Sequence, residues 1–405
     1  MKNLISDTNS VHNLKTTTKL FKESLDDFFK LFDSSPSAMA ITDIRRLKFV
    51  KVNEKFVEFF GYKKEEVIGR TAIDISIHDK TEFNRILNFL KKNQGFQNQI
   101  FKGRTKDGRA VYLIASSEIM EINGKKYSVS SFLDITEIKV QQIIIERQNK
   151  EIFDSINYAR LIQKAIFPSK NQLEDVFPKS FVLAKQKHIM SGDFHWIEKH
   201  KNKVFIAVSD CTGHGVPSAI LSIIGYKLLS KFIFEYGFSS PAEFLNQLNN
   251  EFFVSDKQII ESVFEIKDGL DIALCVVDKS KMTMMYAGAY NPVYQIRKGK
   301  FTKLSVDKIP IHLFTKYTGE KFTNHEIKIE KDDIYYMFSD GYASQFGGTK
   351  GRKFMHKNLQ ELILSIQHLT MSEQREIFNN SIKEWENTLG VEQINDILIL
   401  GFKIS

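Results

Sequence analysis

Two stretches of five apolar residues, each of the length of a buried strand, end in the same Ser-Asp dipeptide. The stretches are Val204–Val208 and Ile334–Phe338, and the dipeptides that follow them are Ser209-Asp210 and Ser339-Asp340. A short apolar run that stops at turn residues is typical of a strand in a packed sheet. Each strand therefore places a carboxylate at a rigid edge, and Gly341 lets backbone or solvent approach that edge closely.

Two further segments in the same half of the chain also place an aspartate at a strand end or a tight turn. They are Ser191-Gly192-Asp193 and the pair Asn395-Asp396, which precedes the last apolar run. One such site alone is usually only a turn, as we expect for Asp107-Gly108. Hard divalent cations such as Mg²⁺ and Mn²⁺ prefer carboxylate, carbonyl and water oxygens. Converging edges of this kind would hold two cations about 3.5–4 Å apart and activate a water for in-line attack on phosphorus.

The segment from residue 172 to residue 405 alternates between strand and helix patterns. We expect strands at 204–209, 271–277, 281–287, 292–297, 333–339 and 396–403. The expected helices are 217–234, 355–366 and 371–388. Antiparallel strands with long helices outside them predict a sandwich of two sheets covered by helices, an α/β fold.

The segment from residue 20 to residue 135 reads as a smaller mixed domain. We expect strands at 38–43 and 48–52, then helices through Phe56–Phe60 and through 81–90. Three further strands follow, separated by Asp107-Gly108 and Asn123-Gly124. These dipeptides tolerate positive φ and favour two-residue hairpins. Two strands, short helices and an antiparallel meander describe a small sensor domain.

Residues 136–171 form a helical connector between the two domains. Isoleucine or alanine recurs at seven-residue spacing, at Ile138, Ile145, Ile152, Ala159 and Ile166. This spacing is typical of a helix that faces a partner helix. Three of the four companion positions are polar (Gln141, Gln148, Ser155 and Ile162), so the seam should be weak and able to change register. We expect a homodimeric signalling helix; the alternative is an ordinary amphipathic helix that lies on the following domain.

Length, charge and composition limit which classes of protein remain possible. A chain of 405 residues is too long for one ordinary core, which favours two domains and a connector. The net charge of +8 is spread from end to end rather than gathered in a basic stripe, so we expect no nucleic-acid partner. Only Cys211 and Cys275 occur, and no apolar run reaches the ~18 residues of a membrane span. The first twenty residues lack an apolar signal core, so we expect a cytoplasmic protein with no membrane partner.

The N-terminal segment resembles the PAS family over about 115 residues. The resemblance rests on SPSAMAITDI, FVKVNEKFVEFFGYKKEEVIGR and SFLDITE. It implies a five-stranded antiparallel sheet with helices over one face, which in some members holds a small molecule. No cysteine precedes Cys211, so the flavin-binding subclass, which needs a reactive cysteine, is disfavoured. His78 is the one histidine of the segment, and a lone histidine is more often a surface or core residue than a haem ligand. The sensed ligand is unknown.

Residues 152–405 resemble the SpoIIE-like branch of the PPM (PP2C-type) phosphatases. The matching blocks are SINYARLIQKAIFP, SGDFHWI, VSDCTGHGVPSAILSIIG, DGLDIALCVVD, YAGAYNPVYQIRKGK, DKIPI and FSDGYASQFGG. The resemblance implies an α/β/β/α sandwich that hydrolyses phosphoserine or phosphothreonine on proteins. It also implies two Mn²⁺ or Mg²⁺ ions as the cofactor. The typical substrate in this branch is a phosphorylated anti-sigma-factor antagonist.

Carried over by position, the resemblance makes Asp193, Asp210 and Asp340 the catalytic carboxylates and metal ligands. Asp210 would bridge the two ions, and the carbonyl of Cys211 would follow it. The family has two adjacent aspartates before the last strand, the first of them a ligand. Here the pair is Asn395-Asp396, and a neutral amide should weaken one site. Asp396 is the alternative ligand at this place.

Two rival interpretations and one further catalytic candidate involve residues of the same site. A pseudophosphatase would bind a signalling partner without turnover, and the neutral Asn395 keeps this alternative open. A cysteine-dependent phosphatase needs arginine six residues after its cysteine, and neither Cys211 nor Cys275 has one. His214, at the start of a helix, is a weaker candidate for a general acid, because a helix N-terminus disfavours protonated imidazole.

Overall fold

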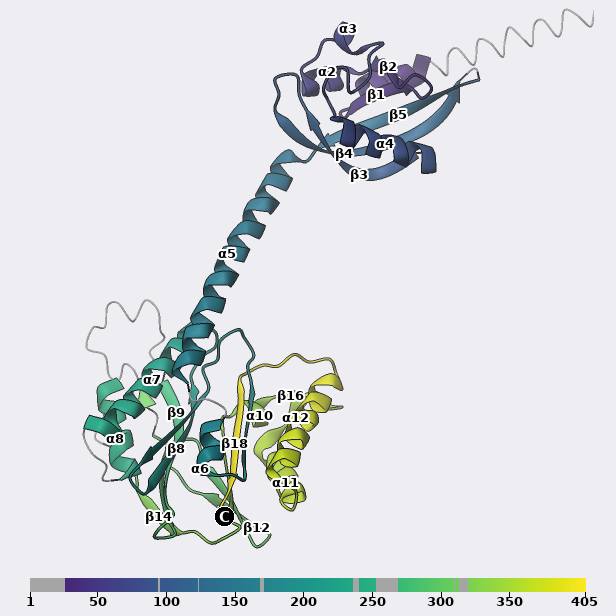
Figure 1. The fold of residues 1–405 in the computed structure, drawn as a ribbon. Helices are drawn as coiled ribbons and strands as arrows, with labels where there is room; N and C mark the ends of the chain where they lie inside the picture. The colour runs from purple at the N-terminus through teal and green to yellow at the C-terminus, as the bar shows by residue number, and fades with distance from the viewer. Residues whose placement is uncertain are drawn as a thin grey trace, which may run out of the picture. The chain divides into compact units, whose positions relative to one another are not determined.

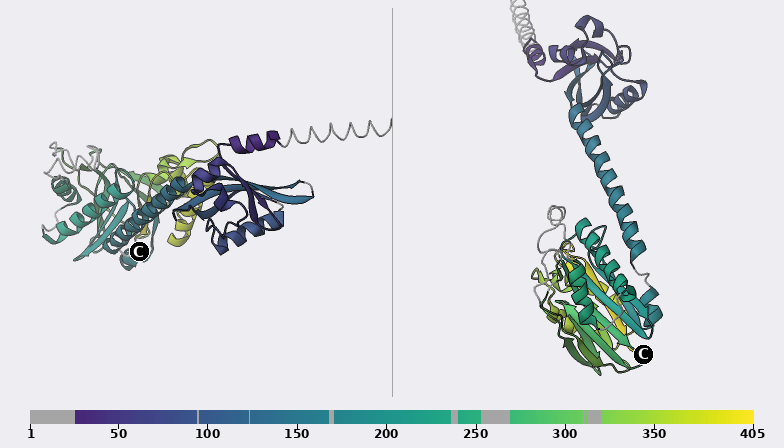
Figure 2. Two further views of the ribbon diagram at one scale, coloured as in Figure 1. Left: turned by 90° about the horizontal axis from the view of Figure 1, so that it is seen from above. Right: turned by 90° about the vertical axis from the view of Figure 1, so that its left-hand side faces the viewer.

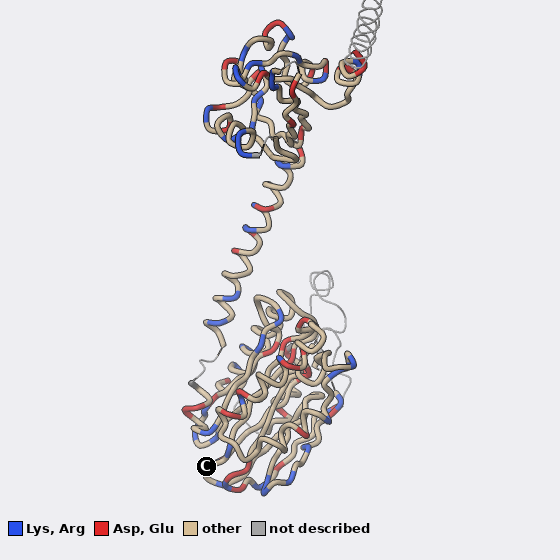
Figure 3. The backbone as a smooth tube through the Cα atoms, turned by 90° about the vertical axis from the view of Figure 1, so that its right-hand side faces the viewer, with Lys and Arg blue, Asp and Glu red and all other residues tan. Residues whose placement is uncertain are grey.

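A computed structural model describes residues 26–405, except residues 94, 123, 168–170, 236–239, 253–268, 310 and 313–319. The chain divides between Lys150 and Glu151 into two compact units, coloured purple to blue and teal to yellow in Figure 1. We refer to them as the N-terminal unit and the C-terminal unit. Lys and Arg are interspersed with Asp and Glu in both (Figure 3).

The N-terminal unit is built on one five-stranded antiparallel sheet. Its strands, in the order β2-β1-β5-β4-β3, are β2 (Lys48–Val52), β1 (Ala38–Asp43), β5 (Lys125–Asp134), β4 (Ala110–Ile122) and β3 (Gly95–Arg104). The predicted meander is therefore confirmed, and β1 and β2 have the expected bounds. Residues 20–25 of the predicted domain and Asn123 of the predicted turn lie outside the described residues.

One of the two predicted hairpins is longer than expected. Ile122 pairs with Lys125, so only two residues join β4 to β5. Five residues, however, separate β3 from β4 at Asp107-Gly108. The hydroxyl of Thr105 donates to the carboxylate of Asp107, and the Gly108 amide donates to the Thr105 carbonyl at 2.9 Å. This local bonding builds a wider turn than the two-residue prediction.

The helices of this unit are α2 (Glu54–Phe60), α3 (Lys64–Val67) and α4 (Lys80–Asn93). Fully buried Asn53 starts α2, because its Oδ1 accepts from the Phe56 amide at 2.9 Å. The same side chain donates to the carbonyls of Phe32 and Ser37, which fixes the chain that enters β1. Apolar side chains of α2, including Phe56 and Phe60, complete a core with β1, β2 and β4.

The predicted connector, residues 136–171, contains one unbroken helix, α5 (Thr136–Ile166), and its residues 168–170 lie outside the described residues. It begins on the N-terminal sheet, since the Tyr112 amide donates to Oγ1 of Thr136 at 2.9 Å. Ile138, Ile145 and Ile152 are exposed, whereas Ala159 and Ile166 are half-buried. The last turns therefore pack on the C-terminal unit, as an amphipathic helix would, and the earlier turns leave an apolar face open.

Two antiparallel sheets form the centre of the C-terminal unit. The first has the order β14-β10-β9-β8-β7, with β14 (His325–Lys328), β10 (Thr283–Ala289), β9 (Gly269–Asp278), β8 (Lys203–Cys211) and β7 (Phe194–His200); short β13 (Ile311–His312) also pairs with β9. The second has the order β12-β11-β15-β18-β6, with β12 (Lys300–Leu304), β11 (Val293–Arg297), β15 (Ile334–Phe338), β18 (Ile397–Lys403) and β6 (Ser180–Lys185). A small hairpin joins β16 (Phe346–Gly347) to β17 (Arg352–Lys353).

Helices cover both outer faces of this pair of sheets (Figures 1 and 2). On the first sheet lie α7 (Val216–Glu235) and α8 (Pro241–Phe252), and on the second lie α11 (Met355–Ile366) and α12 (Met371–Asn387). Short α6 (Asn171–Val176) and α10 (Gly341–Ser344) complete the unit. Alternate strand residues face the space between the sheets or a helix layer, so three apolar clusters result. The predicted helix-covered sandwich is confirmed.

Among the described residues, α7 is the one helix that is long and apolar enough to cross a membrane. Its side chains Leu221, Leu229 and Phe232 are fully buried against the first sheet. Burial of this kind is what the core helix of a sandwich requires.

Candidate active site

Asp210 and Asp271 face each other at the carboxyl-terminal end of β8. They are directly paired residues of neighbouring antiparallel strands, and such pairs point to the same face of a sheet. Burial raises the pKa of Asp210 well above its usual range, and the charges of Asp193, Asp340 and Asp271 add to this rise. Burial, with the charge of Asp340, raises the pKa of Asp271 to about 6. Asp271 was not among the predicted site residues, although it stands at the start of the apolar run in DGLDIALCVVD.

Asp193 lies in the loop directly before β7 and is only 8% exposed. Its Oδ2 is buried without a hydrogen-bond partner in the described part of the chain. Burial raises the pKa of this carboxyl, and the charges of Asp396 and Asp340 raise it further, while a hydrogen bond from Ser339 opposes them. A buried carboxylate oxygen of this kind is costly unless a cation or a donor meets it.

Gly192 lets the Asp193 loop approach β8. A Cβ on Gly192 would lie 2.9 Å from Cβ of Ser218 and 3.2 Å from the carbonyl oxygen of Cys211. The first distance is too short for a Cβ and the second is tighter than an ordinary contact. The carbonyl of Cys211, a predicted ligand, therefore lies beside this loop, while its buried side chain packs in the core under α7.

Asp340 connects the second sheet to the first. Its backbone N–H donates to Oδ2 of Asp210 at 3.2 Å. The next residue must be glycine, because a Cβ on Gly341 would lie 1.9 Å from the carbonyl oxygen of Asp396. The Ser-Asp-Gly sequence thus has a steric cause: it brings the end of β15 against the segment before β18.

Asn395 and Asp396 have different partners. Nδ2 of Asn395 donates to Oδ1 of Asp340 at 3.0 Å, and its Oδ1 accepts from the Asp396 amide at 2.9 Å. Asp396 is buried, and its carboxylate accepts three hydrogen bonds, from the Lys187 amide at 2.8 Å, the Ser191 hydroxyl at 2.9 Å and the Gly192 amide at 2.8 Å. Asp396 therefore holds the Asp193 loop in place, whereas Asn395 acts on Asp340.

All six predicted positions are brought together by these bonds and charges. The charged neighbours that shift the pKa of Asp193, Asp210 and Asp271 are all carboxylates. In the described ranges, no three side chains of His, Cys, Asp and Glu already stand at the mutual spacing of a metal cluster. Repelling carboxylates with an unpartnered buried oxygen lack a positive charge, and oxygen ligands suit a hard divalent cation. The residues present fit such an ion.

The connector helix reaches this site through Gln163, which is 1% exposed. Its Nε2 donates to the Ser191 carbonyl at 2.7 Å and to Oγ of Ser222 at 3.0 Å, and its Oε1 accepts from the Ser191 amide at 3.4 Å. Ser191 in turn bonds to Asp396, and its Oγ accepts from the Asp193 amide at 3.1 Å. Gln163 was not predicted, because nothing local distinguishes it from the other glutamines of the helix.

His214 lies beside a second histidine. The rings of His188 and His214 are 5.0 Å apart, and both residues are exposed. His188 follows Lys187, whose amide binds Asp396, and His214 follows the Asp210 strand end. Two imidazoles therefore flank the loops that carry the carboxylates. The role of His214 as a general acid stays a prediction.

A two-sheet sandwich with helices on both outer faces and carboxylates gathered at its strand ends defines a PP2C-type domain. The chain belongs to the SpoIIE family: the model of Stage II sporulation protein E matches residues 200–404, and a PAS domain model matches residues 36–137. The SiaA-PP2C domain of Pseudomonas aeruginosa is similar in structure, with 26% identity and a TM-score of 0.55 over 64% of this chain and 99% of that one.

Two characterised proteins are similar in sequence. Phosphoserine phosphatase RsbU of Bacillus subtilis is 27% identical over 232 residues, 57% of this chain and 64% of RsbU. The methyl sulfide methyltransferase-associated sensor of Methanosarcina acetivorans is 27% identical over 142 residues, 35% of this chain and 13% of that sensor. The chain thus spans less than two thirds of the length of either relative.

Proposed function

We propose that this protein hydrolyses phosphoserine or phosphothreonine on a partner protein and that its PAS unit regulates the reaction. Family membership and the similarity to RsbU, named a phosphoserine phosphatase, support the reaction class. The observation that carries the proposal is Oδ2 of Asp193, buried without a partner among carboxylates that repel one another. Such a set is suited to a cation that also binds phosphate.

The residues that would hold two Mn²⁺ or Mg²⁺ ions are Asp193, Asp210, the Cys211 carbonyl and Asp340, with Asn395 or Asp396 at the fourth place. When bound, the ions would neutralise charge on the phosphoryl oxygens and lower the pKa of a water. The chain itself positions these ligands: the Asp340 amide orients Asp210, and Asn395 orients Asp340. Asp271 adds a further carboxylate beside Asp210 and is a candidate ligand.

A second candidate function is phosphoprotein binding without turnover. It is favoured by Asn395, which is neutral and already uses both ends of its amide within the protein, on Asp340 and on the Asp396 amide. Asp396 likewise spends its carboxylate on three hydrogen bonds. One cation would then be held by fewer charges, which lowers its affinity.

Regulation through the connector is supported by how its two ends are bound. Thr136 accepts a hydrogen bond from Tyr112 of the PAS sheet, and Gln163 bonds both backbone groups of Ser191 beside Asp193. A change in the rotation of α5 would therefore be felt by a loop that carries a proposed ligand. The exposed face through Ile138, Ile145 and Ile152 suits a second copy of the chain, giving a homodimer.

The substrate that we propose is a phosphorylated anti-sigma-factor antagonist, and the proposed compartment is the cytoplasm. The test is hydrolysis of p-nitrophenyl phosphate and of a phosphoserine peptide by the full chain, with Mn²⁺ and with EDTA. We expect Mn²⁺-dependent turnover that Asp210→Asn reduces at least a hundredfold while the far-UV circular dichroism stays unchanged. Equal turnover in the wild type and Asp210→Asn would exclude the metal-dependent phosphatase. Retained binding of the peptide with no turnover at saturating Mn²⁺ would favour the second candidate.

A further inference from the structure

His188 and His214 form the one contact between two histidine rings in the described part of the chain. Their ring centres are 5.0 Å apart and the ring planes are inclined by 39°. Both side chains are exposed. Within the described ranges, neither imidazole has a hydrogen bond or an ion pair. The ring nitrogens are therefore available to a ligand from solvent.

The backbone presents these two side chains from separate loops. His214 stands between Gly213 and Gly215, whose φ angles of 90° and 78° lie in the left-handed region that glycine adopts without strain. This turn leads from β8 into α7. His188 lies in the loop between β6 and β7, one residue after the amide that binds Asp396. Two segments that are distant in the sequence thus bring the rings together beside the carboxylates.

The spacing of the two rings matches that of two ligands of a single metal ion. A Zn–N bond of about 2.0–2.1 Å places the centre of a coordinated imidazole about 3 Å from the ion, and at the tetrahedral angle two such centres lie about 5 Å apart. The observed separation is 5.0 Å. Imidazole nitrogens suit Zn²⁺ and its neighbouring transition metals, whereas carboxylate oxygens suit harder ions. The histidine pair therefore differs in its metal preference from the carboxylate cluster.

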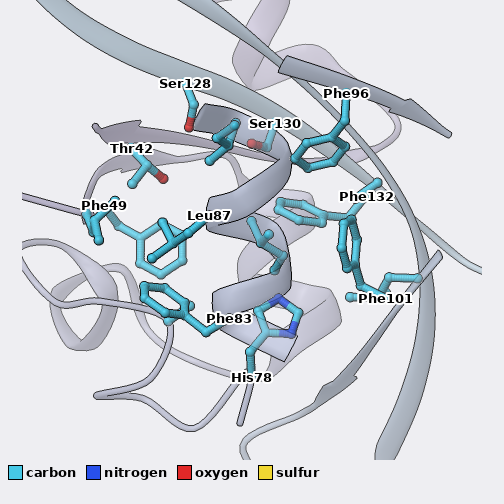
Figure 4. Close-up of a pocket in the computed structure, with 16 residues that line it drawn as sticks. Thr42, Phe49, His78, Phe83, Leu87, Phe96, Phe101, Ser128, Ser130 and Phe132 are labelled. Atoms are coloured by element: carbon cyan, nitrogen blue, oxygen red, sulfur yellow. The ribbon is translucent and has the colours of Figure 1, made fainter. Parts of the chain in front are cut away.

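Other histidines have partners of a different kind. His78 is 7% exposed among the apolar side chains of the pocket in Figure 4, and its Nδ1 is 2.7 Å from the carbonyl oxygen of Lys102. The ring of His325 stacks on Tyr286, with ring centres 4.8 Å apart. Among the described residues neither ring contacts a second histidine. Both solvent access and the neighbouring imidazole thus distinguish His188 and His214.

We propose that His188 and His214 together bind one Zn²⁺ ion, or a transition-metal ion of the same class, with water at its remaining positions. The ion would join the loop before β7 to the turn before α7. Two protein ligands leave an open site, so the ion would bind less tightly than one in a closed structural site of four protein ligands. The inference uses a separate set of ligands and does not depend on phosphatase activity.

The test is a calorimetric titration of the full chain with Zn²⁺ in excess Mg²⁺, which competes for carboxylate sites. We expect one Zn²⁺ ion to bind at the pair. His188→Ala and His214→Ala should each weaken Zn²⁺ binding at least tenfold. The double variant should lose little more than either single variant, because both substitutions remove ligands of one ion. His368 is another exposed histidine, and His368→Ala should leave the Zn²⁺ affinity unchanged.

Electron paramagnetic resonance of bound Cu²⁺ identifies the ligands directly, because Cu²⁺ binds nitrogen ligands more tightly than Zn²⁺ does. We expect nitrogen splitting from two imidazoles in the wild type. Each of His188→Ala and His214→Ala should reduce this splitting to that of one imidazole or remove it.

Three results would overturn the proposal: Zn²⁺ binding that survives both substitutions, Zn²⁺ binding that depends on only one of the two histidines, or no binding up to millimolar Zn²⁺. Zn²⁺ binding that is lost in Asp210→Asn but kept in His188→Ala would also overturn it, since the ion would then occupy the carboxylate cluster. Should His214→Ala fail to fold, His214→Gln removes the imidazole with a side chain of similar size.

Discussion

The side-chain amide of Asn395 donates a 3.0 Å hydrogen bond to Oδ1 of Asp340. At this place a carboxylate would repel Asp340, so the asparagine stabilises the carboxylate cluster without any cation. Compared with an aspartate at position 395, the asparagine also removes one negative charge from the proposed cation site. If a cation binds at the proposed site, Asn395 would favour the cation-free protein at the expense of metal affinity.

Asn395→Asp should reverse this balance. Without metal it replaces a hydrogen bond by like-charge repulsion, so the melting temperature of the C-terminal unit should fall. With Mn²⁺ the added charge should lower the half-saturating concentration at least fivefold and raise turnover of p-nitrophenyl phosphate several-fold. The measurements are thermal melts with and without Mn²⁺ and a Mn²⁺ titration of activity. Asn380→Asp, at an exposed position of α12, is the charge-matched control. If the activity and melting temperature of Asn395→Asp depend on Mn²⁺ as those of the wild type do, Asn395 does not contribute to the metal site.

Gln163→Leu should weaken metal binding without touching a ligand. It leaves the buried amide of Ser191 unpaired, at a cost of about 1–3 kcal/mol, and it leaves the Ser191 carbonyl with the Ser222 hydroxyl, at 3.3 Å, as its remaining donor. The Asp193 loop is then held less firmly. We expect Mn²⁺ affinity, measured by calorimetry, to fall about tenfold, with activity largely restored at high Mn²⁺. Lys164 is an exposed neighbour, and Lys164→Ala should leave the Mn²⁺ affinity and the activity unchanged. Lower thermal stability with unaltered Mn²⁺ affinity would show that Gln163 serves packing alone.

Ile152→Asp should shift the protein toward monomer. Ile152 is 58% exposed on the apolar face of α5, and a charge in an apolar seam between two chains is unfavourable. Sedimentation of the full chain measures the shift, and basal phosphatase activity should change with it. Asn157→Asp makes the same charge change on another face of α5 and should keep the dimer. A dimer that persists in Ile152→Asp would place the contact between copies elsewhere.

The N-terminal unit should lose stability as the pH falls below about 6.5, the ordinary pKa of histidine. Burial lowers the pKa of His78 in the folded state, although the Lys102 carbonyl, Glu82 and Asp79 oppose it. The unfolded state therefore binds the proton first, and acid favours unfolding. Hydrogen exchange of β1–β5 at pH 7.5 and 5.5 should show faster opening at the lower pH. In His78→Leu the opening rate should change less with pH. An equal pH dependence in the wild type and the variant would show that other groups cause it.

The strands that the sequence pattern missed share one property. We expected β8, β9, β10, β11, β15 and β18, and each lies inside a sheet. Apart from the two-residue strands β13, β16 and β17, the unpredicted strands of the described C-terminal unit are β6, β7, β12 and β14, which end the two strand orders. An inner strand of this sandwich is covered on both faces and reads as a continuous apolar run. An edge strand such as β7 includes half-buried Glu198 and exposed Lys199 and loses that signal.

The site residues likewise fall into those that local sequence predicts and those that only tertiary contacts reveal. Asp210 and Asp340 were predictable, because each follows an apolar run and stands at a strand end by local sequence alone. Asp271 joins them only because β9 pairs with β8 in one register, a long-range property. Gln163 is recognisable only once Ser191 is packed against it. Burial of a single polar side chain depends on tertiary contacts that no local pattern records.

The connector helix also limits how this protein can have been assembled. Its 31 residues contain neither proline nor glycine, and each residue turns the chain by about 100°. An insertion of seven residues nearly restores the facing direction, whereas one of two or five residues would turn a different side toward the proposed second copy of the chain. A gene fusion that supplied another sensor ahead of α5 would need to join it in the same angular phase. The exchange of sensors in evolution is therefore restricted by an angle, while the sensors themselves are free to differ in sequence.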